Sequence, residues 1–343
     1  MSLATKYRPK EFNEVCGQQS IINILSRQVE VRNFSNCYLF SGPSGCGKTT
    51  LARIFARKIN GGSGNPIELD AASNNGVDNI RTIITESRER SLDSEYKVFI
   101  IDECHMITTA GWNAFLKCIE EPPKYTIFIF CTTDPQKIPE TILNRVMKFS
   151  ISKLPDVLIE RRLSDICSFE NIYFDEASIK YITKISNGGM RDAISALDKV
   201  YQYSNVIDIN LTTSILGNYS YDSMFDLTNL IIDGNRIGII SLVESLHSDG
   251  TDLKVFLDEY IDFILDLTKF TILKDSSSLS IPVQYINAES SNVRSVKYTT
   301  GIENNVAFFN KLLDKLMDAK LILKTDPSVK TTLIVLLLKI CGE

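Results

Sequence analysis

Two kinds of hydrophobic spacing alternate along residues 1–155. Short unbroken apolar runs are typical of buried β-strands, whereas apolar residues recurring every three or four positions are typical of amphipathic helices. Leu51, Ile54 and Phe55 form one such helical stripe. Strands are predicted at 36–40, 67–72, 96–101, 125–132 and 147–151, and helices at 50–59, 73–87 and 111–121. Apolar strands separated by helices indicate a parallel five-stranded sheet covered on both faces.

The pattern becomes helical after about residue 155. Helices are predicted at 157–168, 175–186, 191–203, 304–323 and 328–341, and the polar, Ser-rich stretch 274–295 is predicted to be a loop. The chain is therefore expected to hold three domains. These are an α/β domain at 1–155, a small helical domain at 156–204 and an all-α domain at 205–343.

Residues 41–50 read SGPSGCGKTT, and Gly42 to Thr49 fit G-x-x-x-x-G-K-[ST]. Such a loop turns backbone N–H groups toward phosphate oxygens, while Lys48 adds positive charge and the Thr49 hydroxyl can ligate Mg²⁺. A chance match is the alternative, but the predicted strand before the loop and the helix after it are the setting that a phosphate-binding loop needs. The loop predicts nucleotide binding without saying what hydrolysis drives.

A carboxylate pair, Asp102 and Glu103, ends the predicted strand VFII. Asp102 is expected to hold Mg²⁺ through water beside Thr49, and Glu103 to polarise the attacking water as general base. At the end of the strand YTIFIFCT, a hydroxyl of Thr132 or Thr133 is positioned to orient that water. Solvated acids and simple strand-end chemistry are the plainer readings of these residues.

Two arginines complete the candidate set. Arg191 begins a predicted helix and is suited to sense a γ-phosphate, and Arg145 precedes a strand from which it could serve a neighbouring subunit in trans. Taken singly, each is more often a surface salt-bridge residue. Their positions after the other motifs favour the functional reading.

Composition narrows the alternatives. The net charge is −5, so any nucleic-acid contact is expected on a local face, because a protein that coats DNA by bulk charge is basic. The eight cysteines include no C-x-x-C pair, so zinc is not expected and the thiols are interpreted as small reduced hydrophobes. The first residues resemble no signal peptide and no apolar run approaches the ~20 residues of a membrane helix. A cytoplasmic protein without membrane contact is expected, in a bacterium or an infected host cell.

Seven segments carry a family resemblance. In order they are LATKYRPKEFNEVCGQ, YLFSGPSGCGKTTLAR, IELDAAS, FIIDECHM, WNAFLKCIEEPP, CTTDPQKIPETIL and GGMRDAISALDK. With them the chain resembles the AAA+ clamp loaders, and among these the gamma/tau ATPase subunits of bacterial DNA polymerase III. The likeness is dense over 3–200 and weaker over the helical remainder, which resembles a collar domain. It implies an AAA+ domain, a helical lid and an all-α collar.

The resemblance implies a role for each matched residue. It places Tyr7, Arg8 and Pro9 near adenine, Asp102 and Glu103 in the Walker B pair, Thr133 at sensor 1, Arg191 at sensor 2 and Arg145 at the trans-acting arginine finger. ATP and Mg²⁺ would be held by the phosphate-binding loop, comprising Gly42, Ser44, Gly45, Cys46, Gly47, Lys48, Thr49 and Thr50.

The implied partners are a sliding clamp, primer–template DNA, and copies of this chain or related subunits in a pentameric ring. Arg81 is the candidate for a DNA phosphate contact on the inner face of that ring.

Three departures from the family pattern are visible. The segment 58–70, KINGGSGNPIELD, stands where bacterial members carry a four-cysteine zinc module. The finger motif Ser-Arg-Cys is replaced by Asn144-Arg145-Val146. No counterpart of the long form's C-terminal extension is expected in this sequence.

Two other functions stay open. One is a structural subunit of the same ring that does not hydrolyse ATP. The other is a different AAA+ machine acting on DNA, such as a branch-migration motor or a helicase loader. The intact loop, acidic pair and arginines disfavour the first, and the segments FNEVCGQ, IEEPP and TTDPQKIP disfavour the second.

Overall fold

The computed structural model describes residues 1–216, 221–273, 302–324 and 326–341. The loop predicted at 274–295 lies outside the described residues. The chain forms two compact units, which are considered separately below. The first comprises Met1–Tyr173 with Ile182–Gln202, and the second comprises Phe174–Tyr181 with Tyr203–Glu343. The predicted domain limits at 155 and 204 stay a prediction.

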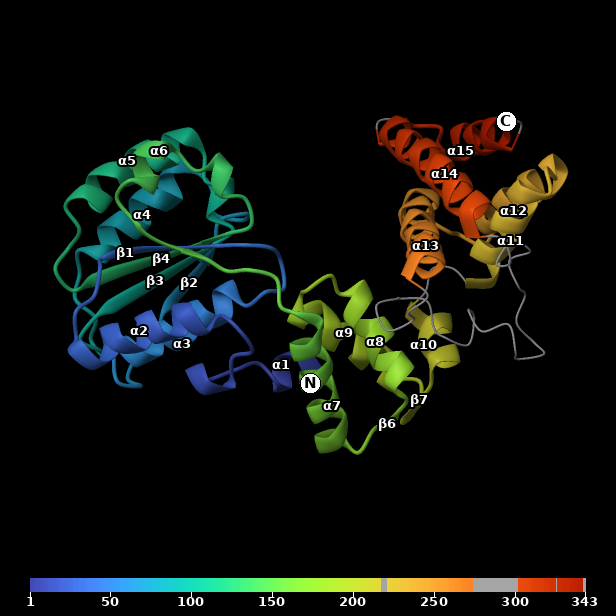
Figure 1. Cartoon of the computed structure of the whole chain (residues 1–343). Coiled ribbons are helices and arrows are strands. Elements are labelled where there is room, and N and C mark those ends of the chain that lie inside the picture. Colours follow the sequence, from blue (N-terminus) through green and yellow to red (C-terminus); the bar gives the residue numbers. More distant parts are fainter. Residues whose placement is uncertain (217–220, 274–301, 325, 342–343) are drawn as a thin grey trace. The chain divides into compact units, whose positions relative to one another are not determined.

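The first unit is built on a five-stranded parallel sheet, as the hydrophobic pattern predicts (Figure 1). The strand order is β2-β3-β4-β1-β5. The strands are β1 (Cys37–Ser41), β2 (Ile67–Asp70), β3 (Lys97–Asp102), β4 (Thr126–Thr132) and β5 (Met147–Ser150). Strand β2 ends two residues before the prediction, because the N–H groups of Ser73 and Asn74 turn back to the carbonyl of Asp70.

Helices cover both faces of the sheet (Figure 1). The alternation of a strand sends successive side chains to opposite faces. Tyr38 and Phe40 of β1 therefore pack with α2 (Gln19–Val31) and α3 (Lys48–Ile59). Leu39 packs on the other face with α4 (Val77–Ser87) and α5 (Thr109–Glu120). Two buried layers of this kind fix the strand ends firmly, and the site is built there.

The predicted helices of this unit are all present, and some were not foreseen. Helix α3 begins at Lys48 rather than at residue 50, because Gly47 provides its N-cap with a left-handed φ of 100°. Helix α2 and the short α1 and α6 have no counterpart in the sequence analysis. The remaining helices here are α1 (Leu3–Lys6), α6 (Glu140–Leu143), α7 (Asp156–Glu170) and α9 (Met190–Tyr201), while α8 (Glu176–Ile185) spans the division between the units.

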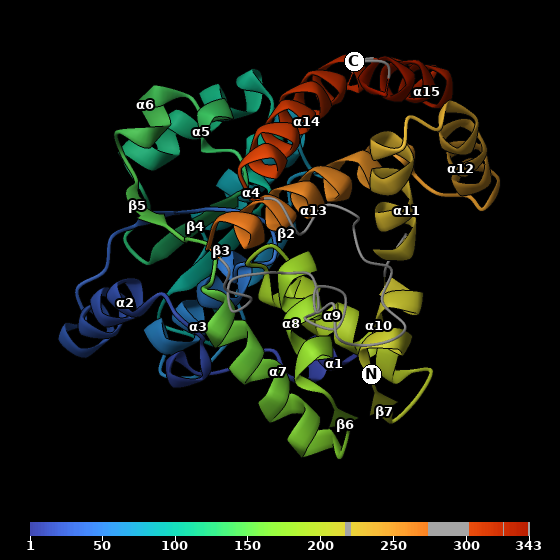
Figure 2. The ribbon, with the colours of Figure 1, turned by 45° about the vertical axis from the view of Figure 1, so that its right-hand side comes forward.

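The second unit is mainly helical (Figure 2). Its helices are α10 (Ile209–Leu216), α11 (Tyr221–Ile232), α12 (Arg236–Ser248), α13 (Leu253–Leu273), α14 (Ile302–Leu323) and α15 (Val329–Ile340). Two short strands, β6 (Tyr173–Phe174), whose first residue belongs to the first unit, and β7 (Val206–Ile207), pair in a separate small sheet. Helices α13 and α14 pack along each other.

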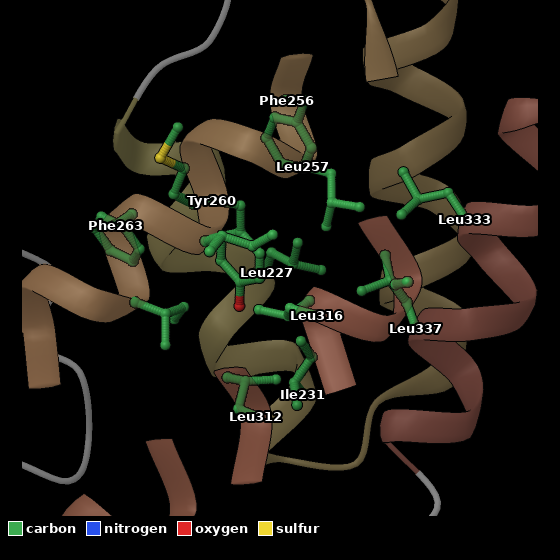
Figure 3. Packing of buried hydrophobic residues seen from close by; sticks show 14 of the residues in the cluster. Leu227, Ile231, Phe256, Leu257, Tyr260, Phe263, Leu312, Leu316, Leu333 and Leu337 are labelled. Atoms are coloured by element: carbon green, nitrogen blue, oxygen red, sulfur yellow. The ribbon is translucent and has the colours of Figure 1, made fainter. Parts of the chain in front are cut away.

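The core of the helical unit is apolar and is shown in Figure 3. Leu227 and Ile231 of α11 meet Phe256 of α13, Leu316 of α14 and Leu337 of α15. Within this core, the Thr228 and Tyr260 hydroxyl groups form a hydrogen bond of 3.0 Å. Burial raises the pKa of Tyr260, so this phenol stays protonated within the core.

All eight cysteines carry free thiols, and six of them are buried. In the described parts of the chain, no helix is both long and apolar enough to cross a membrane.

Candidate nucleotide site

The phosphate-binding loop joins β1 to α3 at the carboxyl end of the sheet, where ligands of parallel α/β folds bind. Gly42 is required by a close approach as well as by its φ of 152°. A Cβ there would lie 2.1 Å from the carbonyl oxygen of Ile151. The Gly42 N–H donates to the Thr132 carbonyl at 3.1 Å. Strand β4 therefore holds the first residue of the loop.

Lys48 and Thr49 open helix α3, and their side chains reach the loop and the end of β3 respectively. The Lys48 side chain is buried, and its Nζ donates to the carbonyls of Gly42 and Pro43, each at 2.9 Å. The Thr49 hydroxyl donates to Asp102 Oδ2 at 2.7 Å. The loop and the end of β3 are thus joined by a direct side-chain contact, which places the predicted Mg²⁺ residues together.

Glu103 stands one residue beyond β3 with a left-handed φ of 45°. Non-glycine residues in this conformation carry strain and gather at functional sites. Its N–H donates to Asp102 Oδ1 at 3.0 Å, and its Oε2 accepts the Thr133 hydroxyl at 3.0 Å. The predicted general base and the predicted sensor 1 hydroxyl therefore touch. Thr133 contacts the carboxylate itself, a contact that the sequence did not reveal.

Helix α9 and the turn that precedes it contact the loop. The Arg191 N–H donates to the Gly45 carbonyl at 3.3 Å, and the Cys46 thiol lies 3.6 Å from the Gly188 carbonyl. A Cβ on Gly45 would lie 2.7 Å from Asp192 Oδ2. Contact with α9 is therefore made through the backbone of the loop, and the loop tolerates no side chain at Gly45 without a shift.

The N-terminal segment is fastened to α7 and α9. The Tyr7 hydroxyl and Lys6 Nζ both donate to Glu170 Oε1, and the Tyr7 ring stacks on Phe169 with 6.3 Å between centroids. Burial and the Glu170 carboxylate raise the pKa of Tyr7 to about 12. The Leu3 N–H donates to Asp198 Oδ2 at 3.1 Å. Tyr7 thus uses its hydroxyl to hold the segment against the helices.

These elements enclose a cavity of about 300 Å³. Burial, followed by the charges of Arg53 and Arg191, lowers the pKa of the Arg8 guanidinium at its edge. Glu14, Val15, Cys16, Leu154, Arg162 and Ile194 also face it. The predicted residues that line it are Tyr7, Arg8, Pro9, Ser44, Gly45, Cys46, Gly47, Lys48, Thr49, Thr50, Asp102, Glu103 and Arg191.

Other predicted residues lie outside this lining. Thr133 reaches the cavity only through Glu103, and Gly42 forms the base of the loop. Arg145 lies apart, with its guanidinium paired to Glu120 Oε1 at 2.8 Å and donating to the Thr141 carbonyl at 2.6 Å. Arg81 is exposed on α4 and pairs with Asp78 at 3.2 Å.

Several site residues were missed by the sequence analysis. His105 follows the acidic pair in FIIDECHM, and Asp192 follows Arg191 in GGMRDAIS, so both lay inside segments already singled out. Glu170 gave no signal, because its partners Lys6 and Tyr7 are more than 160 positions away in the chain. Arg162, whose guanidinium lies 5.9 Å from the Tyr7 ring, was hidden for the same reason.

Family comparisons match three consecutive parts of the chain. Residues 66–155 match the family described as DNA polymerase III, delta subunit. Residues 158–205 match the ATPase lid domain of DNA polymerase III clamp loader subunits, and residues 207–296 match domain III of DNA polymerase III subunits gamma and tau.

Relatives extend this likeness over most of the chain. The gamma/tau subunit of DNA polymerase III from Mycobacterium tuberculosis H37Rv is 33% identical over 306 residues, covering 82% of this chain and 53% of that protein. The tau subunit from Bacillus subtilis is 35% identical over 76% of this chain and 50% of its own length. The tau subunit from Escherichia coli K12 is 28% identical over 76% of this chain and 44% of its own. The chain thus spans about half the length of the relatives it matches.

Solved structures give the same fold. The RuvB Holliday junction branch migration motor of Thermotoga maritima superposes with a TM-score of 0.52 at 22% identity, covering 70% of this chain and 85% of that one. The parallel sheet, phosphate-binding loop and lid define a P-loop AAA+ protein whose helical remainder is of the collar type. The chain belongs to the clamp-loader family of AAA+ proteins and is gamma/tau-like.

Proposed function

We propose that this chain is an ATPase subunit of a DNA sliding-clamp loader, which uses ATP to open the clamp and load it onto primer–template DNA. One observation carries the proposal. Lys48, Thr49, Asp102 and Glu103 converge on a single cavity that Arg191 also lines. A subunit without hydrolysis has no need to keep a general base beside the metal residues and the phosphate-binding loop.

Phosphate binding falls to the loop and Lys48. The Lys48 ammonium already lies within the loop, held by the carbonyls of Gly42 and Pro43. A triphosphate entering the loop would receive the backbone N–H groups and exchange those carbonyl contacts for phosphate oxygens. Arg191 would approach the γ-phosphate from the start of α9.

The residues present fit Mg²⁺. Thr49 Oγ1 and Asp102 Oδ2 are hard oxygen donors only 2.7 Å apart, and Mg²⁺ keeps several waters while binding few protein groups. Thr49 and Asp102 would hold the ion. When bound, it would neutralise charge on the β and γ phosphates.

Glu103 would take the proton of the attacking water. As the water oxygen bonds to the γ-phosphorus, the bond from that phosphorus to the β–γ bridging oxygen breaks, and ADP leaves with the electron pair. The contact with Thr133 fixes the Glu103 carboxylate for this step.

We place the chain in a pentameric ring with copies of itself or related subunits. Arg145 would serve a neighbouring site as the arginine finger. Its partner Glu120 is half-exposed, and exposed ion pairs are weak, so a phosphate can displace it. Arg81, exposed on α4, would contact a phosphate of the primer–template DNA.

The test is steady-state ATPase activity of the purified chain alone, with primer–template DNA, and with DNA plus the sliding clamp of its own replication system. Stimulation by both supports the loader and makes this chain its motor. If binding is normal but no stimulation is seen, candidate partner subunits are added. Failure with all of them would favour the non-hydrolysing ring subunit or a different AAA+ machine.

A further inference from the structure

The proposed mechanism leaves one partly buried histidine without a role. His105 lies on η2 (Cys104–Met106), the 3₁₀ turn that follows β3, and its side chain is only 12% exposed. Its Nδ1 lies 3.2 Å from Glu103 Oε2 and 3.2 Å from Thr132 Oγ1. The imidazole thus lies between Glu103, which follows β3, and Thr132, the last residue of β4.

The partners of Nδ1 decide which group donates. A carboxylate oxygen only accepts, so a favourable contact requires the proton on Nδ1. The Thr132 hydroxyl accepts the N–H of Asp134 at 3.0 Å, and its residue is fully buried on β4. Thr132 therefore gives the imidazole a rigid neighbour, and the ring is fixed in the orientation that aims Nδ1–H at Glu103.

Glu103 Oε2 then receives two side-chain donors, Thr133 Oγ1 at 3.0 Å and His105 Nδ1 at 3.2 Å. A carboxylate oxygen offers about two lone-pair directions. These two side-chain donors, together with the Thr133 N–H at 3.4 Å, occupy the acceptor directions of Oε2, which leaves Oε1 to meet a water. The strained backbone at Glu103 brings the carboxylate to these donors, since residues two apart in a regular helix do not face each other.

We propose that His105 is a positioning residue for the general base, acting through its Nδ1–H on Glu103 Oε2 so that Oε1 faces the attacking water. The inference rests on the proposed ATPase function. It predicts that His105 matters for the hydrolysis step and not for nucleotide affinity, because Nδ1 contacts the base and not the phosphate-binding loop.

The experiment compares two substitutions in the assembled loader. His105→Leu keeps an apolar side chain but removes the donor, and His105→Asn presents an amide N–H close to the position of Nδ1. Single-turnover hydrolysis and equilibrium binding of a fluorescent ATP analogue are measured for both. The matched control is His247→Leu, because His247 is the chain's other histidine and is exposed on α12.

The expected result is a drop in the hydrolysis rate of up to about 10²-fold for His105→Leu, the scale on which misplacement of a catalytic group acts. Nucleotide affinity stays unchanged, and His105→Asn recovers most of the rate. In a Glu103→Gln background the Leu substitution has no further effect, because His105 acts only through that carboxylate.

Three outcomes overturn the inference. An unchanged rate in His105→Leu, or a faster one, would show that the imidazole does not hold the base in a productive position. Equal losses in the Leu and Asn variants, accompanied by a lower melting temperature, would make His105 structural. A wild-type loader without hydrolysis would remove the proposed function and this inference with it, so the two failures are distinct.

Discussion

The interior of the nucleotide site and its outer arginines are organised in opposite ways. Inside, the functional side chains contact one another: Thr49 meets Asp102, and Thr133 meets Glu103. Outside, Arg145 is paired with Glu120 at the end of α5, and Arg81 is paired with Asp78 on its own helix α4. The interior is complete within one chain. The two arginines are held by exposed ion pairs, which a second molecule could replace in the roles proposed for them.

The difference shows what a single chain determines. Parallel strands bring their carboxyl ends to one edge, so β1, β3 and β4 assemble the interior by folding alone. An ion pair between an exposed arginine and an exposed carboxylate contributes little to stability, so folding alone holds the arginine only weakly in that position. Substitutions of the interior residues should therefore impair nucleotide binding or hydrolysis even in the isolated chain. Substitutions of the exposed arginines should have an effect only when a second subunit or DNA is present.

The largest effect is expected for Lys48→Ala. Removing the ammonium from the loop should abolish productive nucleotide use while the fold is kept, because Lys48 supplies the positive charge that the loop places beside the phosphates. ATPase assays and thermal denaturation check this prediction. Retained turnover would overturn the assignment of the site.

Arg145→Ala should spare ATP binding and slow hydrolysis in the assembled ring by ~10³-fold, the usual scale for an arginine finger. The matched control is Arg88→Ala, an exposed arginine at the end of α4. Mixing Arg145→Ala with Lys48→Ala should restore part of the activity, because each variant keeps the part that the other lacks. No rescue in a ring shown to form would contradict the trans role.

Tyr7→Phe tests the border between the two regions. It removes the hydroxyl that reaches Glu170 but keeps the stack on Phe169. We expect nucleotide affinity to fall by about fivefold, equivalent to about 1 kcal/mol for one hydrogen bond. Tyr173→Phe, at an exposed tyrosine, is the control. Nucleotide affinity is measured by titration with a fluorescent analogue. Equal effects of the two substitutions would show that the latch, meaning the contacts of Lys6 and Tyr7 with Glu170, does not support nucleotide binding.

The same latch gives a pH dependence. Hydrogen bonds from Lys6 and then Tyr7 lower the pKa of Glu170 below its ordinary value. A group whose pKa is lowered by folding stabilises the fold above its unfolded pKa, and this stabilisation is lost as the pH falls through the lowered one. Nucleotide affinity should therefore weaken in acid more steeply in the wild type than in Glu170→Gln.

The smallest effect is expected for Arg81→Ala. Loss of one phosphate contact should weaken DNA binding uniformly across sequences and reduce the slope of log affinity against log salt by about 1. Asp78→Asn should act in the opposite direction, because it frees Arg81 from its ion pair. An unchanged slope of log affinity against log salt in Arg81→Ala would show that Arg81 does not contact a DNA phosphate.

Much of this arrangement could be predicted from local sequence. The five strands were located because continuous apolar runs mark buried parallel strands, and the loop was located because its glycines and Lys48 follow a strand. The contact of Thr133 with Glu103 could not be predicted, because it depends on the left-handed backbone of Glu103. Such a conformation is usually signalled by a glycine, and position 103 is a glutamate. The latch from Tyr7 to Glu170 was hidden because it joins positions distant in the chain.

The backbone hydrogen bond between Gly45 and Arg191 has a thermodynamic consequence. A phosphate that changes the conformation of the loop also changes the free energy with which α9 packs against the loop. By thermodynamic linkage, a change in the packing of α9 then changes phosphate affinity in turn. If a neighbouring subunit binds α9 and shifts it, that binding must change nucleotide affinity by a certain factor. Nucleotide binding must then change the affinity of the neighbouring subunit for α9 by the same factor. In a ring of such subunits, the occupancy of one site would then be communicated as a bias in affinity at the next.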